Sequence, residues 1–409
     1  MKQKYMIDTK ENQLFLKEIR ENLLNFGHRF PAPDGTCYYL GDDGTPWKTR
    51  NRDTYETCRM PHVYTIGKYL GHEGSEELID AAIKGLRGAA KDRENGGWFS
   101  SVTPDGGHVE NKLCYVHAFV ILAASDAVLA EYPEGKELLR DALDTYDRYF
   151  WNEEAGMACD TWNTEFTVLD SYRGLNANMH TVEAFLAAAD VTGDERYRVR
   201  CGRIIRHVIG WAADNEWRIP EHYTSDWKPD LECNRDDQFK PYGATPGHGI
   251  EWARLITQWA LSTYKKDDKK ADLYIESAKK LFDRAVKDGW NADGEPGIVY
   301  TTDWNGKPVV HDRMHWVLAE AINTSAVLWH VTGKQKYADA YAGFMEYLDE
   351  KVLDHKNGSW FHQMDCNNVP SNTVWPGKPD LYHAVQATLI PYYVPDLSIA
   401  VAVKEGKRI

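Results

Sequence analysis

Asn95-Gly96-Gly97-Trp98-Phe99 returns late in the chain as Asn357-Gly358-Ser359-Trp360-Phe361, and this repetition decides the fold. Each copy opens a segment in which turn residues stand between aromatic or β-branched residues, as in a β-hairpin. Such segments follow one another along the chain, with turns near residues 43, 105, 163, 228, 305 and 367. Self-similarity at a regular spacing is the sign of a repeat architecture.

Two helices fit between consecutive hairpins, and their hydrophobic patterns differ. Residues 271–286 place apolar side chains at i, i+3, i+4 and i+7, with Lys, Asp and Glu on the other face. This pattern predicts an outer amphipathic helix. Residues 179–191 and 319–331 are apolar almost all round, which indicates inner helices. Gly193 and Gly333 follow these two segments and suit left-handed C-terminal caps.

Repeats of two helices predict an all-α fold. The expected helical spans are 10–26, 59–70, 75–91, 111–131, 135–149, 178–192, 194–213, 247–264, 269–287, 313–331, 334–350 and 382–394. Alternating inner and outer helices close as an (α/α)6 barrel of six helical-hairpin repeats, with short β-hairpins at one end. A TIM barrel is excluded because the eight buried strands that it needs are absent. No linker interrupts the pattern, so residues 1–409 are predicted to form a single catalytic domain.

Composition limits the partners and the compartment. The 409 residues include 62 Asp and Glu against 48 Lys and Arg, a formal net charge of -14, which disfavours nucleic acid and anionic membranes. No apolar run is long enough to span a bilayer, and the N-terminus has no secretory signal. The seven cysteines form no C-x-x-C pair, which is typical of reduced thiols in a cytoplasmic protein. The 15 Trp, many beside polar loop residues, suit the apolar faces and hydroxyl rims of sugars.

Polar residues recur near the start of each expected inner helix, namely Arg59, Tyr115, His180, His248, His315-Trp316 and His383. If the repeats are equivalent, these side chains lie at one end of the barrel and converge on its axis. A lone His near a helix start is usually a packing or capping residue, but three at equivalent positions favour catalysis. A Glu follows His180 by three residues, and Glu251 follows His248 in the same way. At this spacing on a helix, each carboxylate can orient its imidazole.

A metal site and other enzyme classes are alternatives for the same residues. Dinuclear carboxylate proteins use Glu-x-x-His, whereas this chain has His-x-x-Glu, and no zincin-type His pair is present. Arg59 is expected at the same end of the barrel as the histidines, where its charge would oppose a bound cation. Nucleotide-binding motifs are absent as well, so we expect no metal and no cofactor. A glycoside hydrolase needs two carboxylates across the scissile bond, but the inward candidates here are imidazoles. Imidazoles titrate near neutrality and suit the proton transfers of sugar isomerisation or epimerisation.

Five blocks of the sequence resemble a known family. They are Arg59-Met-Pro-His-Val-Tyr64, Asn176-Ala-Asn-Met-His180-Thr-Val-Glu-Ala-Phe185, Thr245-Pro-Gly-His248-Gly-Ile-Glu251-Trp252, Gly297-Ile-Val-Tyr-Thr-Thr-Asp-Trp304 and Asp380-Leu-Tyr-His383. In this order they resemble the N-acylglucosamine 2-epimerase superfamily over essentially the whole chain. Within it they are most similar to the bacterial aldose–ketose isomerases, which include D-mannose isomerase and sulfoquinovose isomerase.

The resemblance implies a metal-free proton-transfer mechanism. His180 is expected to help open the pyranose ring. His383 is expected to remove the C2 proton and return it to C1 through a cis-enediol. His248, oriented by Glu251, would move a proton between O1 and O2. Arg59 would stabilise the charge of the enediolate, a contribution that is commonly large.

The resemblance also implies sugar contacts and a substrate class. The expected contacts are Tyr115, Asn176, Trp316, Glu320 and Trp375, with core packing as the alternative, together with Tyr55, Gln238 and His362. The chain departs from sulfoquinovose isomerase where Gln238 replaces an Arg, His362 a Gln and Tyr55 a Trp. Losing a fixed cation removes the main reason to bind an anionic sugar. We therefore expect interconversion of D-mannose and D-fructose, with D-lyxose and D-glucose as further candidates.

Other functions stay open at this point. A D-mannose 2-epimerase would convert mannose to glucose with the same histidines, and sulfoquinovose isomerisation is the charged-substrate alternative. A sugar-binding or regulatory barrel without catalysis belongs to a different class, and the presence of His180, His248 and His383 argues against it. In each case the partner is a small sugar rather than nucleic acid or a membrane. Homo-oligomerisation is left open.

Overall fold

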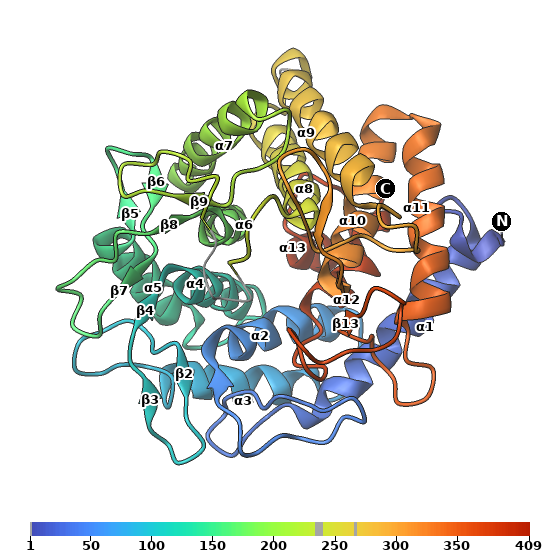
Figure 1. Cartoon of the computed structure of the whole chain (residues 1–409). Coiled ribbons are helices and arrows are strands. Elements are labelled where there is room, and N and C mark those ends of the chain that lie inside the picture. The colour runs from blue at the N-terminus through green and yellow to red at the C-terminus, as the bar shows by residue number, and fades with distance from the viewer. Residues whose placement is uncertain (1, 234–239, 266–267) are drawn as a thin grey trace.

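Two concentric rings of helices build the molecule. The computed structural model describes residues 2–233, 240–265 and 268–409. Figure 1 shows the inner ring around a centre, formed by α2 (Thr54–Tyr69), α4 (Cys114–Leu129), α6 (Leu175–Thr192), α8 (Pro246–Thr263), α10 (His315–Thr332) and α12 (Tyr382–Ala387). Outside it lie α1 (Lys10–Phe26), α3 (Ser75–Arg87), α5 (Gly135–Tyr149), α7 (Arg196–Asp214), α9 (Asp268–Gly289) and α11 (Gln335–Tyr347). Each inner helix contacts the next, and α12 packs back onto α2, so the predicted (α/α)6 barrel is confirmed.

Side-chain patterning explains which helices lie inside. In α3, Leu78, Ile79 and Ile83 are buried on one face, whereas Glu76 and Glu77 are exposed on the other. The inner α4 has few polar residues and is buried on nearly every side. An amphipathic helix has one face to bury, while an apolar helix must be surrounded. The inner ring is therefore the core of the molecule, and the outer ring shields it from water.

Short strands gather at one end of the barrel. They are β1 (Arg52–Asp53), β2 (Ser101–Val102), β3 (His108–Val109), β4 (Lys112–Leu113), β5 (Trp151–Asn152), β6 (Met157–Ala158), β7 (Thr161–Trp162), β8 (Arg173–Gly174), β9 (His222–Tyr223), β10 (Thr301–Thr302), β11 (Pro308–Val310), β12 (Arg313–Met314) and β13 (Gln363–Met364). Every predicted turn is closed by a backbone bond, from the N–H of Gly41, Thr103, Asn163, Thr224, Asp303 and Asp365 to the C=O of Thr45, Gly107, Val168, Lys228, Lys307 and Val369. The predicted hairpins are therefore confirmed.

Pairing between neighbouring repeats places the inner helices. The strand just before an inner helix pairs with the hairpin of the next repeat, as in β1 with β2, β4 with β7, β8 with β9 and β12 with β13. Before α8, Ala244 bridges to Thr302 in the same way. Before α12, the N–H of Lys378 donates to the C=O of Leu40 at 2.8 Å, which closes the ring. The first turns of all these helices therefore lie at one end.

Two boundaries differ most from the prediction. The helix expected at 59–70 begins at Thr54, so Pro61 lies inside α2 rather than in the first turn where proline is tolerated. The segment expected at 382–394 ends as α12 at Ala387. Pro391 lacks an N–H and disfavours helix in the residue before it, and only a 3₁₀ turn, Ile390–Tyr392, follows.

A last helix, α13 (Ile399–Lys404), was not predicted. It packs against α2, α4 and α6. Lys404 donates to the C=O of Leu129 at the end of α4, and the N–H of Ser398 donates to Asp190 near the end of α6. The C-terminal segment therefore covers the barrel at the end opposite the hairpins.

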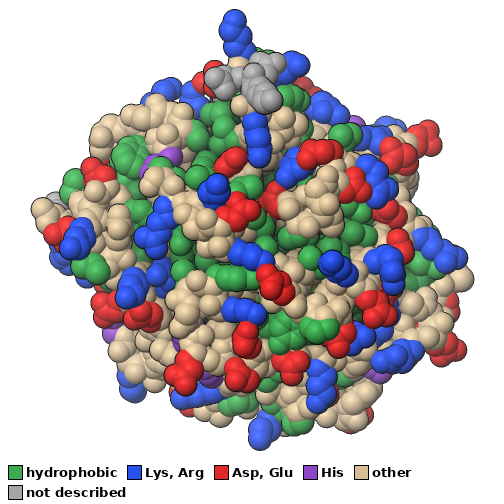
Figure 2. Space-filling view, turned by 180° about the vertical axis from the view of Figure 1, so that it is seen from behind, with side chains coloured by type: hydrophobic (Ala, Val, Ile, Leu, Met, Phe, Trp, Pro, Cys, Tyr) green, Lys and Arg blue, Asp and Glu red, His purple; other side chains and the backbone are tan. Residues whose placement is uncertain are grey.

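The surface is mixed in charge, and the cysteines form no disulfide among the described residues. None of the described helices is long and apolar enough to cross a membrane. On the face shown in Figure 2, Lys and Arg side chains are interspersed with Asp and Glu. All the cysteines are free, and Cys37, Cys58, Cys114, Cys159 and Cys201 are buried.

Candidate active site

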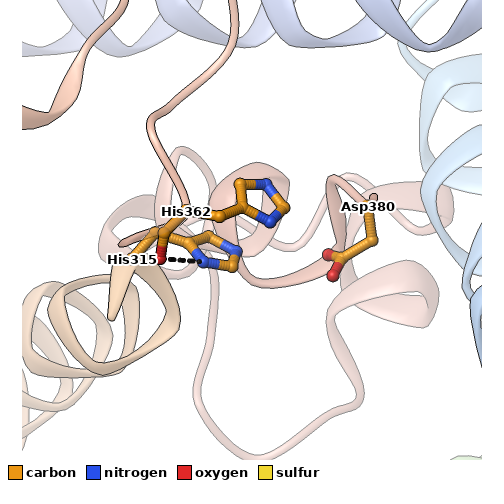
Figure 3. Close-up of side chains that lie close together, drawn as sticks. All are labelled: His315, His362 and Asp380. Atoms are coloured by element: carbon orange, nitrogen blue, oxygen red, sulfur yellow. Dashed lines mark hydrogen bonds between the residues drawn. The ribbon is translucent and has the colours of Figure 1, made fainter. Parts of the chain in front are cut away.

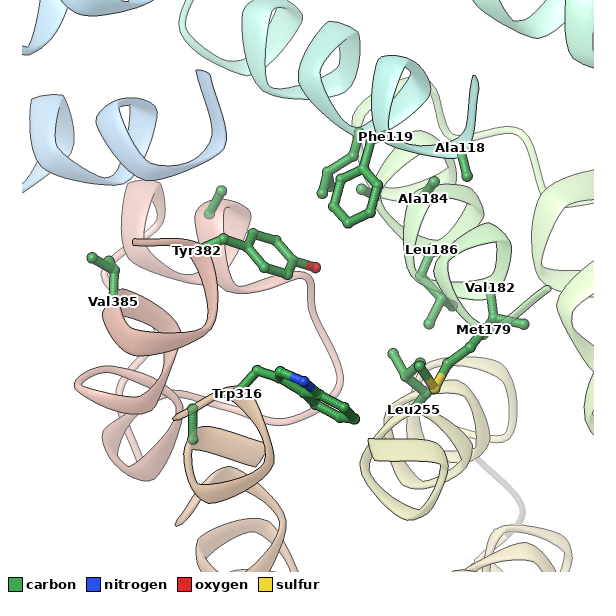
Figure 4. Close-up of a cluster of buried hydrophobic side chains, with 14 of the residues drawn as sticks. Ala118, Phe119, Met179, Val182, Ala184, Leu186, Leu255, Trp316, Tyr382 and Val385 are labelled. Carbon is green, nitrogen blue, oxygen red and sulfur yellow. The ribbon is translucent and has the colours of Figure 1, made fainter. Parts of the chain in front are cut away.

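The predicted inward residues surround one cavity of about 280 Å³ at the hairpin end of the barrel. Each inner helix contributes one of them within its first two turns, namely Arg59, Tyr115, His180, His248, Trp316 and His383. Figure 4 shows the rings of Trp316, Tyr382 and Phe119 directed toward the barrel axis from three different helices. The predicted convergence is therefore confirmed for these six residues, whereas His315 is not among the described residues that line the cavity.

His383 is held from behind by a buried carboxylate. Its Nδ1 lies 3.0 Å from Oε1 of Glu320, and Oε2 of Glu320 accepts a bond from Nε of Arg254 at 2.7 Å. Burial opposes the charge of Glu320, but Arg254 and His383 together hold its pKa below the usual value. Since a carboxylate only accepts, Nδ1 of His383 carries the proton and Nε2 is left to act as a base.

His180 has the partner that the helical spacing predicted. Its Nδ1 lies 3.3 Å from Oε2 of Glu183, one turn farther along α6. Burial lowers the pKa of His180 to about 4, although Glu183 works in the opposite direction. The ring is therefore neutral near pH 7. It lies edge-on to Tyr115, with 5.1 Å between the ring centroids, and 6.4 Å from His383.

The predicted partner of His248 is wrong. Nδ1 of His248 lies 3.0 Å from Oε1 of Glu221, not of Glu251. Glu221 precedes β9, and its C=O accepts the N–H of Leu175 at the start of α6. Glu251 lies one turn below on α8, 3.6 Å from the guanidinium of Arg254. The loop between repeats, rather than the helix, therefore orients His248.

Arg59 is fixed by one partner on α4 and another in the loop before α12. Its Nη1 donates to Oδ2 of Asp380 at 2.7 Å, and its Nη2 donates to the hydroxyl of Tyr115 at 3.0 Å. The guanidinium also lies 5.0 Å from the ring centroid of Tyr55 and 4.8 Å from that of Phe119. A buried cation held in this way is preorganised to stabilise an anion in the cavity.

The expected sugar contacts divide into two groups. Tyr55, Tyr115, Asn176, Trp316 and Trp375 line the cavity. Glu320 and His362 are not among its described lining residues, and Glu320 is wholly buried behind His383. Neither side chain is therefore placed at the cavity wall, where a sugar contact was expected. Gln238 lies outside the described residues.

His362 belongs to a separate buried cluster shown in Figure 3, beside His315 and Asp380. The two imidazoles stack with 3.7 Å between their centroids, and Nδ1 of His315 lies 3.3 Å from the C=O of His362. Burial lowers the pKa of His362 to about 3 and that of His315 well below its usual value. Both rings are therefore neutral, and they pack behind Trp375, with centroid distances to that ring of 5.7 Å for His315 and 6.2 Å for His362.

Among the described residues, three groups have ligand atoms close enough to hold a metal ion: His315 with His362 and Asp380, His180 with Glu183 and Glu251, and His383 with Glu251 and Glu320. A guanidinium already stands at each group. Arg59 pairs with Asp380, and Arg254 pairs with Glu320 and lies 3.8 Å from Glu183. A metal ion at any of them would compete with an arginine for a carboxylate.

Several residues of the candidate site were not predicted from the sequence. Arg254 follows Glu251 by three residues, and Asp380 precedes His383 by three, so helical spacing could have drawn attention to both. Glu221 had no such signal because it is remote from His248 in sequence and lies on a loop. Lys240, which also lines the cavity beside Asp160, likewise lies on a loop.

The chemistry of the cavity is that of a proton-transfer site. Imidazoles, each paired with a carboxylate, face a cavity that also holds a fixed guanidinium and aromatic rings. Imidazole bases can remove a proton from a carbon next to a carbonyl, and a guanidinium can stabilise the enediolate that forms. The tyrosine and tryptophan rings offer the faces and polar edges that a sugar ring needs.

Comparison with known proteins agrees with this geometry. The chain is 42% identical to a D-mannose isomerase of Pseudomonas cannabina pv. alisalensis over 369 residues, covering 89% of each chain. It is 38% identical to a D-mannose isomerase of Thermobifida fusca over 399 residues, covering 96% of this chain and 97% of that one. A crystal structure of a D-mannose isomerase matches 94% of this chain and 98% of its own, with a TM-score of 0.83 and 28% identity.

More distant likeness extends to the epimerase fold. The structure of cellobiose 2-epimerase from Bacillus thermoamylovorans B4167 has a TM-score of 0.79 at 19% identity, covering 92% of this chain and 98% of that one. This likeness concerns the fold alone. The sequence model of the N-acylglucosamine 2-epimerase family matches residues 35–387. The chain therefore belongs to the N-acylglucosamine 2-epimerase family.

Proposed function

We propose that this protein is an aldose–ketose isomerase that interconverts D-mannose and D-fructose without a metal ion. The observation that carries the proposal is His383, whose Nδ1 is held 3.0 Å from Glu320 while its ring lines the cavity. This geometry leaves Nε2 as a base aimed at a bound sugar. The names of the D-mannose isomerases that the chain resembles support the choice of substrate. We also propose that residues 1–409 act as one catalytic domain, since α12 near the C-terminus completes the inner ring with α2.

The reaction begins when the pyranose opens to the free aldehyde. Neutral His180 accepts the proton of the anomeric hydroxyl as the bond from C1 to the ring oxygen breaks, and the imidazolium that forms then gives this proton to the ring oxygen. The C2 proton is then acidic because it lies next to the C1 carbonyl. His383 removes it through Nε2, and the electron pair moves to O1, which gives a cis-enediolate.

Isomerisation is completed on the same face of the enediol. His248, oriented by Glu221, takes the proton of the O2 hydroxyl through Nε2 and gives it to O1. His383 returns its proton to C1, so that C2 becomes the carbonyl carbon of the ketose. Arg59 lies where it can offset the charge on the enediolate oxygen. Removing one such preorganised donor typically costs about 2.7–4 kcal/mol of transition-state stabilisation.

A 2-epimerase is the second candidate, and one observation favours it. His248 and His383 are both paired with carboxylates, and both flank Trp316, with centroid distances of 5.0 and 5.9 Å. Two imidazoles of this kind could serve opposite faces of one enediolate. Return of the proton to C2 from the second face would turn mannose into glucose.

Substrate charge separates the proposal from sulfoquinovose isomerisation. Lys240 lines the cavity, but so does Asp160, whose pKa burial raises to about 6 while Lys240 works to lower it. The charge of Lys240 is therefore partly balanced by Asp160, which weakens its attraction for an anionic sugar. Turnover of D-mannose should exceed that of sulfoquinovose or mannose 6-phosphate.

A panel of free aldoses with product analysis tests the proposal. D-mannose, D-lyxose, D-glucose, sulfoquinovose and mannose 6-phosphate are incubated separately with enzyme before and after exhaustive chelation. We expect ketose from mannose, unchanged by chelation, and little product from the anionic sugars. Exclusive turnover of sulfoquinovose, or activity that chelation removes and a divalent ion restores, would contradict the proposal. Binding of mannose with no turnover of any aldose would indicate a sugar-binding barrel instead.

A further inference from the structure

Below the catalytic histidines, one guanidinium lies among several buried carboxylates. Nε of Arg254 donates to Glu320 at 2.7 Å. Its Nη2 lies 3.6 Å from Oε1 of Glu251 and 3.8 Å from Oε1 of Glu183. The side chains of Arg254, Glu251 and Glu320 are 5% exposed or less, and that of Glu183 is 12% exposed. If Glu183, Glu251 and Glu320 were all ionised, their negative charge would exceed the single positive charge of Arg254 at the floor of the cavity.

Hydrogen bonds identify two of these carboxylates as ionised. Glu320 accepts from His383 and from Arg254. Glu183 accepts from the hydroxyl of Tyr382 and lies 3.3 Å from Nδ1 of His180. A carboxylate that receives several donors is stabilised in its charged form. Glu320 and Glu183 are therefore the ionised carboxylates that balance the positive charge of Arg254, at 2.7 Å and 3.8 Å from its guanidinium.

Glu251 has a different environment. Its Oε1 is buried without a hydrogen-bond partner among the described residues, and its contact with Arg254 is longer than that of Glu320. A buried carboxylate without donors is costly in its ionised form. Burial, reinforced by the charge of Glu320, raises the pKa of Glu251 well above the usual value despite Arg254. The excess negative charge is thus relieved by a proton on Glu251.

Among the carboxylates around Arg254, Glu251 is the one that lines the cavity. It lines the cavity together with His180 and His383. Its carboxyl oxygens come within 4.8 Å of ligand atoms of both histidines. Glu320 is not among the cavity-lining residues, and it lies behind His383.

We propose that Glu251 is a neutral carboxylic acid that donates a hydrogen bond to an oxygen at the C1–C2 end of the bound sugar. This assignment rests on the proposed isomerase function. It replaces the orientation of His248 as the role of Glu251, since Glu221 fills that role. As negative charge develops on O1 in the enediolate, the O–H of Glu251 stabilises it beside Arg59. A carboxylic acid held neutral by its surroundings is an effective donor to an oxyanion.

Two substitutions of Glu251 test the protonation state by kinetics. Glu251→Gln keeps a neutral donor of the same shape, so kcat/KM for D-mannose should stay within about tenfold of the parent. Glu251→Leu removes the donor, so kcat should fall about 10²–10³-fold with KM changed only slightly. Glu183→Gln is the matched control, and it should lose activity because an ionised carboxylate is removed. If Glu251→Gln falls as far as Glu251→Leu, the reaction needs an ionised Glu251 and the proposal is overturned.

Infrared spectroscopy tests the same proposal without any substrate. At neutral pH the parent minus Glu251→Gln difference spectrum should contain the carbonyl band of a protonated carboxylic acid, shifted in D2O. Glu56 and Asp126, whose pKa values burial raises, contribute equally to both samples and cancel. The Glu183→Gln difference spectrum should lack this band. Absence of the band for Glu251 overturns this proposal whatever the activity, whereas a band without turnover of mannose overturns only the proposed function.

Discussion

At the scale of single residues, the site depends on imidazoles held by carboxylates. The pairs are His180 with Glu183, His248 with Glu221 and His383 with Glu320. In each pair Nδ1 donates, which leaves Nε2 to exchange protons with the sugar. Helical spacing predicted the first pair, gave the wrong partner for the second and offered no partner for the third. Spacing along one helix finds a local partner, but it has no information about contacts between repeats.

His383 carries the carbon proton in this account. His383→Gln should lower kcat for D-mannose by about 10²–10⁴-fold, the usual cost of losing a general base. The fold should survive because the imidazole faces the cavity. Steady-state kinetics, with circular dichroism as the folding control, check both statements. A variant within a few-fold of the parent would remove His383 from the base role.

Glu221 is one of the residues that only the structure adds to the site. Glu221→Gln keeps the shape of the side chain but removes the carboxylate that fixes the tautomer of His248, so kcat should fall about 10²-fold. KM should change less, because Glu221 acts on the proton-transfer step through His248. Glu251→Gln serves as the comparison, since Glu251 is not paired with His248. Parental kcat in Glu221→Gln would show that His248 needs no carboxylate partner.

At the scale of elements, the hydrophobic period predicted the helices well and their ends less well. The predicted spans 10–26 and 135–149 coincide with α1 and α5. The start of α2 was predicted five residues late, and Pro61 lies inside the helix rather than in its first turn. Here the buried surroundings of α2, rather than the local preference of proline, decide where the helix begins. The short α13 carries too few residues for a period to be recognised.

Pairing between repeats could not be predicted from the period of the sequence. Each two-residue strand before an inner helix is too short to give a recognisable alternation. Its partner lies in the next repeat, as for β8 and β9, and this pairing brings Glu221 to His248. The repeat spacing thus predicted which residues converge. The contacts that orient them depend on tertiary structure.

Buried lysines stabilise two equivalent loops in distant repeats. Nζ of Lys112 donates to Asp92 and to the C=O of Gly96, and Nζ of Lys378 donates to Asp354 in the same way. Lys112→Met should lower the free energy of unfolding by about 3–5 kcal/mol, since it leaves buried Asp92 without its cation.

Urea denaturation measures this change, with a surface pair as the control. Lys336 and Asp283 form a 2.6 Å ion pair at the surface, about half exposed on both sides. Lys336→Met should cost less than about 1 kcal/mol. Equal losses for Lys112→Met and Lys336→Met would show that burial of the loop pair has no special effect on stability.

At the scale of the whole molecule, ring closure makes the site. Residues from the first helix pair to the last, Tyr55 to His383, meet in one cavity only because Lys378 closes onto Leu40 and α12 packs on α2. The segment with α13 covers the other end, so the sugar cavity opens on the hairpin side. The isomerase and epimerase relatives share this architecture. The fold alone therefore does not decide the product, and the path of the carbon proton does.

Running D-mannose in D2O and following the products by NMR tests this central claim most directly. One base on one face, His383, carries the proton from C2 to the adjacent C1. The account predicts D-fructose as the major initial product, with any solvent deuterium at C1. D-glucose labelled at C2 as the first product, with negligible fructose, would contradict the isomerase assignment and establish the 2-epimerase in its place.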